Sequence, residues 1–131
     1  MSPRTSGSFR PSMTQPTVET PRASWVGWPR TVTWTNIGSA KYSGIYVGKN
    51  DLVARLVKPV FGQLKAGIAA TVHNMIAEAD FVVVQLSGQS ETKAGRPYNN
   101  TYCHVFRIRD GKIGEVTKYF DTELATAVFG P

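Results

Sequence analysis

The dipeptide Asp110-Gly111 constrains the fold more than any other feature of the sequence, because it stands between two extended runs. Asp-Gly is favoured in the two-residue turns of β-hairpins, where both central residues need positive φ. In the run before the turn, every second residue shares one face. That face mixes aromatic, apolar and polar side chains: Tyr98, Asn100, Tyr102, His104, Phe106 and Ile108. Such a mixture is typical of a ligand-pocket wall as well as of a protein core.

Further short runs of alternating residues predict a sheet around this hairpin. We expect strands over residues 31–35, 42–47, 68–77 and 81–90. The last two are close enough in sequence to form a second hairpin. Together with two expected helices, the pattern predicts an α+β fold in which a strongly bent mixed sheet wraps on a helix.

The helices are expected in the middle and at the end of the chain. Apolar residues recur every three or four positions over residues 51–65, which predicts one amphipathic helix with Asn50 as its N-cap and Gly67 at its end. Pro59 falls inside this helix and is expected to disturb its backbone hydrogen bonds. A short terminal helix is expected over residues 122–129.

Length and composition indicate a single globular domain. A chain of 131 residues with 41% hydrophobic residues can bury a sizeable core. It has no apolar run long enough to span a membrane and no apolar segment of a secretory signal, so a cytoplasmic location is expected. The net charge is +6, but no basic cluster or nucleic-acid motif accompanies it. We therefore expect no nucleic-acid or membrane partner.

The sequence offers little for a metal or a cofactor. The single cysteine, Cys103, excludes an internal disulfide and a multi-cysteine metal site. His73 and His104 fall on different predicted strands, and no carboxylate pair joins them at ligand spacing. Neither a glycine-rich phosphate loop nor a nucleophile elbow is present. We expect no metal and no cofactor.

Six segments, in their order and spacing, resemble the SnoaL-like family. They are VTW at 32–34, SGIYVGK at 43–49, EADFVVVQ at 78–85, GRPYNNTY at 95–102, VFRIRDGKI at 105–113 and KYFDT at 118–122. The family belongs to a superfamily with the ketosteroid isomerases, polyketide cyclases, limonene-epoxide hydrolases and nuclear transport factor two-like proteins. The resemblance implies a cone-shaped α+β fold with a small-molecule pocket over residues 31–131.

The N-terminal region departs from the family pattern. Residues 1–24 are rich in Ser, Thr, Pro and Arg, which is typical of a flexible arm. Residues 21–30 contain two prolines and no helical period, so the usual opening helices are expected to be missing or replaced. We expect residues 1–30 to form a flexible or partner-swapped arm, with Trp25 and Trp28 or a second subunit covering the exposed apolar surface. This predicts a homodimer or higher homo-oligomer; an ordinary dimer with an unordered arm is the alternative.

Asp121 and His104 are the expected catalytic residues. The resemblance places Asp121 at the pocket mouth, where epoxide-hydrolase and cyclase relatives have a catalytic aspartate. A carboxyl group that loses hydration beside aromatic rings has a raised pKa and can transfer protons near neutral pH. His104 would share the cavity and hydrogen-bond Asp121. Structural roles remain open for both residues, since Asp121 can also cap the terminal helix and His104 can be a satisfied core histidine.

The other expected ligand-binding residues are aromatic or carry amides. Limonene-epoxide hydrolases have a charged Arg-x-Asp motif on this strand, where this chain has the uncharged Gln85-Leu86-Ser87. Epoxide hydrolysis is therefore not expected, and Gln85 is expected to donate a hydrogen bond to a ligand. Tyrosines supply phenolic donors, and Trp34 and Phe61 pack the cavity floor. The expected ligand-binding set is Trp34, Tyr46, Phe61, Gln85, Tyr98, Asn100, Tyr102, Phe106 and Tyr119.

Two functions are therefore open. The first is an enzyme of the ketosteroid isomerase or polyketide cyclase type, which moves a proton on a compact, apolar, carbonyl-bearing substrate. The second is a non-catalytic ligand-binding or oligomerisation module of the same fold, because fold alone does not decide function. No complete isomerase triad is visible in the sequence.

Overall fold

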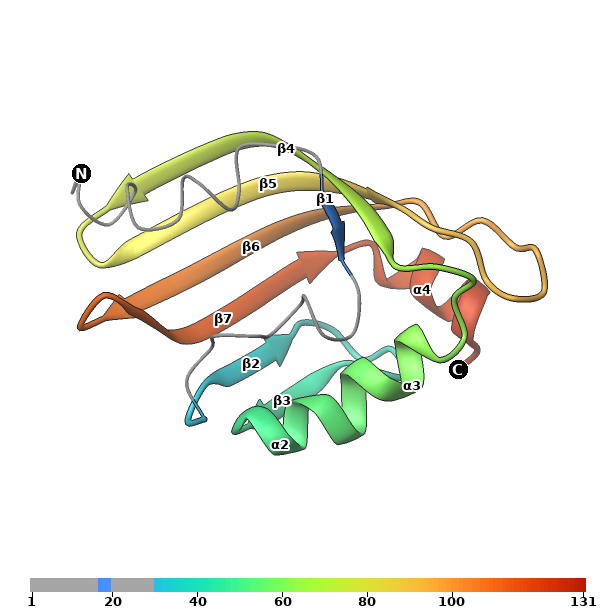
Figure 1. The fold of residues 1–131 in the computed structure, drawn as a ribbon, viewed down its shortest axis with the longest axis horizontal. Helices are drawn as coiled ribbons and strands as arrows, with labels where there is room; N and C mark the ends of the chain where they lie inside the picture. The colour runs from blue at the N-terminus through green and yellow to red at the C-terminus, as the bar shows by residue number, and fades with distance from the viewer. Residues whose placement is uncertain (1–16, 20–29) are drawn as a thin grey trace.

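A curved, seven-stranded mixed sheet dominates the computed structural model, which describes residues 17–19 and 30–131. The strands lie in the order β1-β4-β5-β6-β7-β2-β3, and only β2 and β7 pair in parallel. The sheet arches over one helical segment, while α4 lies beyond the end of β7 (Figure 1). The expected α+β fold with a bent mixed sheet is confirmed. The strands are β1 Thr17–Glu19, β2 Thr33–Asn36, β3 Gly44–Val47, β4 Ile68–Glu78, β5 Phe81–Gln89, β6 Asn100–Arg109 and β7 Lys112–Phe120.

The two predicted hairpins form the middle of the sheet. Asp110 and Gly111 join β6 to β7 with φ values of 54° and 75°. These values are those that the Asp-Gly turn requires. Ala79, with φ 54°, begins the turn from β4 to β5. Local turn chemistry therefore sets the β6–β7 hairpin, whereas alanine is not a residue that favours positive φ.

One helical segment lies under the concave side of the sheet. It runs through α2 Lys49–Leu52, a π-helical turn Val53–Val57 and α3 Lys58–Phe61. The Lys58 N–H donates to the Val53 carbonyl, five residues earlier, immediately before Pro59. Proline has no N–H to continue the ordinary ladder, so the wider turn accommodates it. The predicted disturbance at Pro59 is confirmed.

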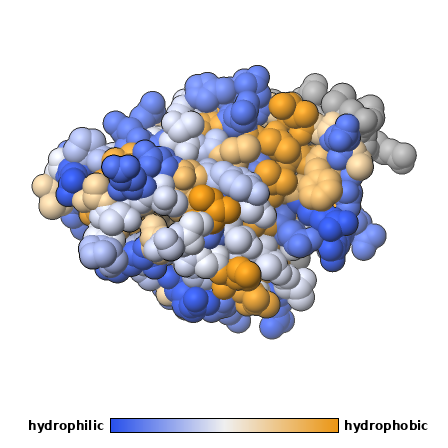
Figure 2. All heavy atoms as spheres, turned by 180° about the vertical axis from the view of Figure 1, so that it is seen from behind, coloured by the Kyte–Doolittle hydropathy of each residue, from blue (hydrophilic) through white to orange (hydrophobic). Residues whose placement is uncertain are grey.

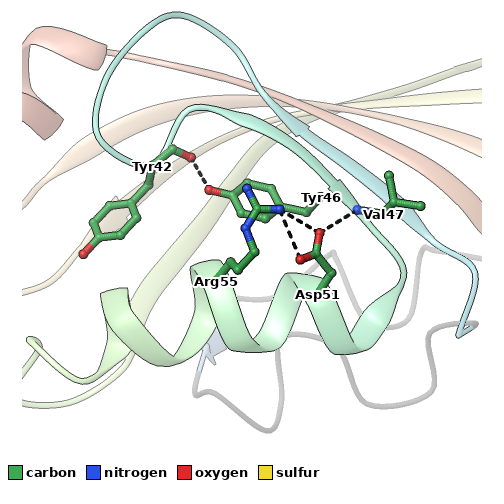
Figure 3. Close-up of polar contacts among 5 residues, drawn as sticks. All are labelled: Tyr42, Tyr46, Val47, Asp51 and Arg55. Carbon is green, nitrogen blue, oxygen red and sulfur yellow. Dashed lines mark hydrogen bonds and ion pairs between the residues drawn. The ribbon is translucent and has the colours of Figure 1, made fainter.

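The predicted bounds of this helix, 51–65, are wrong at both ends. The helix begins at Lys49, after Gly48 turns the chain with φ 88°, and Asn50 is not its N-cap. The Asp51 carboxylate accepts a hydrogen bond from the Val47 N–H at 3.0 Å and pairs with Arg55 at 2.9 Å (Figure 3). These two bonds hold the pKa of Asp51 below its ordinary value.

The C-terminal end of the helix comes earlier than expected. Gly62 is its C-cap, and the chain then leaves the helix. Leu64 forms an isolated bridge with Thr92, and the Lys65 N–H donates to the Glu91 carbonyl at 2.9 Å. Backbone pairing with residues 91 and 92 thus replaces the last expected helical turn. Sequence periodicity does not reveal this pairing.

The main core lies between the sheet and the helical segment. Leu52, Leu56 and Val57 of the helical segment pack against inward-facing side chains of the sheet. The terminal helix α4, Thr122–Phe129, matches its predicted range and packs Ala125 and Phe129 in a second cluster. None of the helices formed by residues 30–131 is long and apolar enough to cross a membrane.

The N-terminal predictions lie largely outside the described residues. Thr17–Glu19 pairs with the edge of β4, in antiparallel register from Thr17 opposite Ala70 to Glu19 opposite Ile68. Trp25 and Trp28 fall in the part that is not described, so their expected packing stays a prediction.

Gly88 is expected to be essential to packing of the curved sheet. A Cβ atom there would lie 2.7 Å from Ile68 Cγ2 and 2.8 Å from Tyr102 Cε2. We predict that Gly88→Ala lowers the free energy of unfolding by about 1–3 kcal/mol, the usual cost of overpacking. Urea denaturation checks this, with Gln89→Ala on the exposed side of the same strand as the control. Equal stability of the two variants would contradict the prediction.

Candidate functional site

A largely apolar cavity lies between the concave face of the sheet and the helices. Its volume is about 120 Å³. The helical segment contributes Leu52, Leu56, Val57, Val60 and Phe61, and α4 contributes Ala125 and Phe129. Aromatic side chains from the sheet form much of the opposite wall. A mainly apolar lining of this kind is typical of small-molecule sites.

A row of three polar side chains crosses the sheet within this cavity. His104 on β6 lies opposite Lys118 on β7, and Lys118 lies opposite Asn36 on β2. All three line the cavity. Residues directly opposite on paired strands have neighbouring side chains on the same face. We call His104, Lys118 and Asn36 the polar row.

Apolar and aromatic side chains flank the polar row on both sides. Residues two positions away along a strand share its inward direction. Tyr102 and Phe106 stand beside His104 in this way, as do Val116 and Phe120 beside Lys118 and Trp34 beside Asn36. The polar groups are thus confined to one line across an otherwise apolar wall.

His104 is enclosed by aromatic rings. Its ring centroid lies 5.9 Å from that of Trp34 and 5.8 Å from those of Tyr102 and Phe106. The side chain is buried, and its Nε2 atom has no hydrogen-bond partner among the described residues. Burial, together with the charge of Lys118, lowers the pKa of His104 to about 3. The imidazole is therefore neutral at physiological pH.

Lys118 brings a positive charge to the aromatic wall. Its Nζ atom lies 4.5 Å from the ring centroid of Tyr102, 5.5 Å from that of Phe120 and 5.9 Å from that of Trp34. An ammonium over aromatic faces is stabilised by cation–π attraction. Asn36 completes the row, accepting from Trp34 Nε1 and donating to the Tyr42 carbonyl at 3.1 Å. The row therefore offers an ammonium and a neutral imidazole to the cavity.

Six of the expected site residues line the cavity: Trp34, Phe61, Tyr98, Tyr102, His104 and Phe106. The hydroxyl of Tyr98 accepts a hydrogen bond from Asn100 Nδ2 at 3.0 Å. Burial raises the pKa of Tyr98. The aromatic face deduced from the Tyr98–Ile108 alternation thus forms one wall of the cavity.

Asp121 lies outside the cavity lining, contrary to the expectation from the resemblance. The residue is exposed, and its Oδ1 atom accepts hydrogen bonds from the N–H groups of Glu123 at 3.1 Å and Leu124 at 3.2 Å. It is the N-cap of α4, the structural role that the sequence also allowed. Phe120, the last residue of β7, takes the inward position instead. The geometry does not bring Asp121 and His104 together as an acid–base pair.

The remaining expected ligand-binding residues also stand outside the lining. Gln85 is exposed, and its Oε1 atom accepts from Asn74 Nδ2 at 2.9 Å. Tyr119 is 47% exposed, because it alternates with the inward-facing Lys118 and Phe120. The side chains of both residues therefore lie on the outer face of the sheet.

Tyr46 and Asn100 are buried but have structural partners. The Tyr46 hydroxyl donates to the Tyr42 carbonyl at 2.7 Å, and Arg55 stacks on its ring (Figure 3). Asn100 donates to the Asp121 carbonyl and accepts from the Asp121 N–H, both at 3.1 Å. These contacts tie β3 to the helix and the start of β6 to α4.

Lys118 and Asn36 are site residues that the sequence pattern did not single out. The signal was present, since Val116, Lys118 and Phe120 alternate along one strand, as do Trp34 and Asn36. In residues 17–19 and 30–131, no group of three His, Cys, Asp or Glu side chains could hold a metal ion. His73 is exposed on β4, with Nε2 2.6 Å from Ser87 Oγ.

Comparison with known structures identifies the fold. A putative isomerase from Bacillus subtilis matches with a TM-score of 0.75 and 20% identity, over 97% of this chain and 93% of that one. An NTF2-like protein from Burkholderia thailandensis gives a TM-score of 0.70 at 19% identity, over 85% of each chain. TerC, co-crystallised with polyporic acid, gives 0.69 at 20% identity, over 98% and 94%. At these identities the likeness shows the fold alone.

The family is shown by the sequence itself. No curated protein matches the sequence significantly. The family model of the SnoaL-like domain matches residues 28–116, which is more than half of the chain. The chain therefore belongs to the SnoaL-like family.

Proposed function

We propose that this protein binds a compact apolar molecule whose oxygen-bearing head group contacts the polar row. The observation that carries the proposal is the Nε2 atom of His104, which is buried in an apolar cavity without a hydrogen-bond partner in the described chain. A buried polar group without a partner costs about 1–3 kcal/mol. A ligand that supplies the missing hydrogen bond offsets this cost.

The size of the cavity supports a small ligand. Its volume of about 120 Å³ is of the same order as the roughly 150 Å³ apolar cavity that binds benzene in an engineered protein. The aromatic rings of Trp34, Tyr102 and Phe106 provide flat apolar surface around the imidazole. A ligand with one ring, or a short branched chain, suits these dimensions.

The polar row suits a carbonyl or related oxygen. A neutral imidazole with a proton on Nε2 can donate a hydrogen bond to a carbonyl oxygen. The Lys118 ammonium adds positive charge beside it, since it lowers the pKa of His104. Together these groups bind and polarise an oxygen atom.

Catalysis of the ketosteroid isomerase or polyketide cyclase type is the second candidate function. Preorganised donors in a dry site stabilise the oxygen charge that develops during enolisation. The fold similarity to the putative Bacillus subtilis isomerase supports this candidate. Against it, no carboxylate from the described residues lines the cavity, and Asp121 caps α4. Ligand binding is therefore the function that the geometry supports best.

The homo-oligomer expected from the sequence stays a prediction. Hydrophobic side chains gather in patches on the face seen in Figure 2. Large hydrophobic side chains are exposed at Ile45, Val47, Ile76, Phe81 and Tyr119. Exposed apolar patches often mark interaction surfaces, which supports the expectation.

Filling the cavity should abolish ligand binding. We predict that Val60→Trp, on the cavity side of α3, weakens the binding of single-ring carbonyl compounds such as acetophenone and phenylacetate at least about tenfold. Ala54→Trp is the matched control, because Ala54 is exposed on the same helical segment. Amide chemical-shift titration of the isotope-labelled protein measures the affinities. Failure of the unmodified protein to bind any such compound would contradict the proposal.

The neutral state of His104 predicts a pH dependence of stability. Between pH 6.5 and about 3, the unfolded chain binds a proton on this histidine that the folded protein does not bind. Stability therefore rises with pH across this window, with a slope of up to about 1.4 kcal/mol per pH unit. We predict a shallower slope for His104→Gln, measured by urea denaturation from pH 4 to 6.5. The slope of the unmodified protein is the reference, and an identical slope in His104→Gln would contradict the prediction.

A further inference from the structure

We infer that the side chain of Tyr42 is a gate that controls the entry of a ligand into the cavity. A hydrogen bond between the Tyr42 hydroxyl and Gln63 holds the ring in its closed position. A ligand enters or leaves when this bond breaks and the ring swings outward. The inference rests on the proposed function, because the gate serves the same cavity. Tyr42 thus sets the rates of binding and release more than the affinity.

The exposed part of the cavity lining marks where the cavity meets the surface. The lining residues of the described chain that keep some exposure to solvent are Ala40, Lys41, Tyr42, Val60, Phe61, Lys118 and Phe120. Five of these seven belong to two segments, the loop 37–43 between β2 and β3 and the end of α3. We call the region between these two segments the cavity mouth.

Tyr42 joins the elements that surround the cavity mouth. Its hydroxyl accepts a hydrogen bond from Gln63 Nε2, just beyond α3, at 3.1 Å. The same amide group donates to the Pro59 carbonyl at 3.0 Å, which fixes its direction. The Tyr42 ring also meets the Phe129 ring of α4 edge to face, with centroids 5.9 Å apart. The side chain therefore closes the mouth between the loop, α3 and α4.

The backbone of Tyr42 is anchored more firmly than its side chain. Its carbonyl accepts hydrogen bonds from the Tyr46 hydroxyl at 2.7 Å and from Asn36 Nδ2 at 3.1 Å. Figure 3 shows the Tyr42 ring pointing away from Tyr46, toward the α3 end of the helical segment. A partly exposed ring that is held by one neutral hydrogen bond and by ring contacts can rotate about its side-chain bonds while the chain stays in place.

A gate of this kind affects binding and release equally. The ligand passes through the same open state in both directions, so a change that makes this state more populated accelerates both steps. The dissociation constant, which is the ratio of the two rate constants, then stays the same. A direct contact between the Tyr42 hydroxyl and the ligand would instead slow dissociation alone.

Tyr42→Phe and Gln63→Met remove the hydrogen bond from its two sides, and the phenylalanine keeps the ring. The probe is acetophenone, and NMR line-shape analysis of its titration into the full chain measures both rate constants. We expect each variant to raise both rate constants by a factor of about two to ten, the usual net effect of one hydrogen bond, with an unchanged Kd. The double variant should be no faster than the single variants, because both remove the same bond.

Tyr119→Phe is the control for loss of a tyrosine hydroxyl. Tyr119 is 47% exposed and lies outside the cavity lining, so this variant should bind acetophenone at unchanged rates. Circular dichroism checks that all variants fold. Unchanged rate constants in Tyr42→Phe and Gln63→Met, or faster dissociation alone with a weaker affinity, would overturn the gate while leaving the proposed function in place. A lack of acetophenone binding by the unmodified protein would overturn both.

Discussion

The alternation of side chains across paired strands decides what this protein presents to a ligand. His104, Lys118 and Asn36 occupy matching positions on β6, β7 and β2, so the same register that holds the sheet together lines them up inside the cavity. The adjacent inward positions hold Trp34, Tyr102, Phe106, Val116 and Phe120. A shift of one residue in β7 would move Lys118 to the outer face and replace it with an adjacent residue. The chemistry of the site thus depends on strand pairing.

Most of the fold could be predicted from the sequence because its signals are local. The Asp110-Gly111 turn, the period-two runs and the terminal helix all rest on backbone preferences that act over a few residues. The bounds of the long helix could not be predicted in the same way. Its end depends on backbone pairing of Leu64 and Lys65 with Thr92 and Glu91, which lie far along the chain. Such contacts produce no periodic pattern in the sequence.

The candidate site was only partly predictable. Alternation along β6 gave the aromatic wall and His104, because each is set by the phase of one strand. The sequence pattern does not single out Lys118, although its phase matches that of Val116 and Phe120, because a lysine at an inward position is unusual. Asp121 was expected in the pocket from family resemblance, yet two backbone N–H groups of α4 hold its carboxylate at the helix start. The alternation of a strand does not fix the direction of a side chain just beyond its end. The sequence pattern therefore could not decide whether Asp121 faces the pocket or caps α4.

The central claim is that a neutral imidazole lies buried beside an ammonium on the inner wall of the cavity. Nitrogen-15 NMR of the histidine rings, recorded from pH 8 to pH 4, tests it most directly. We predict that the His104 ring nitrogens keep the shifts of a neutral imidazole throughout this range, because burial and Lys118 lower the pKa to about 3. A transition to imidazolium with a midpoint near the ordinary value of about 6.5 would contradict the account.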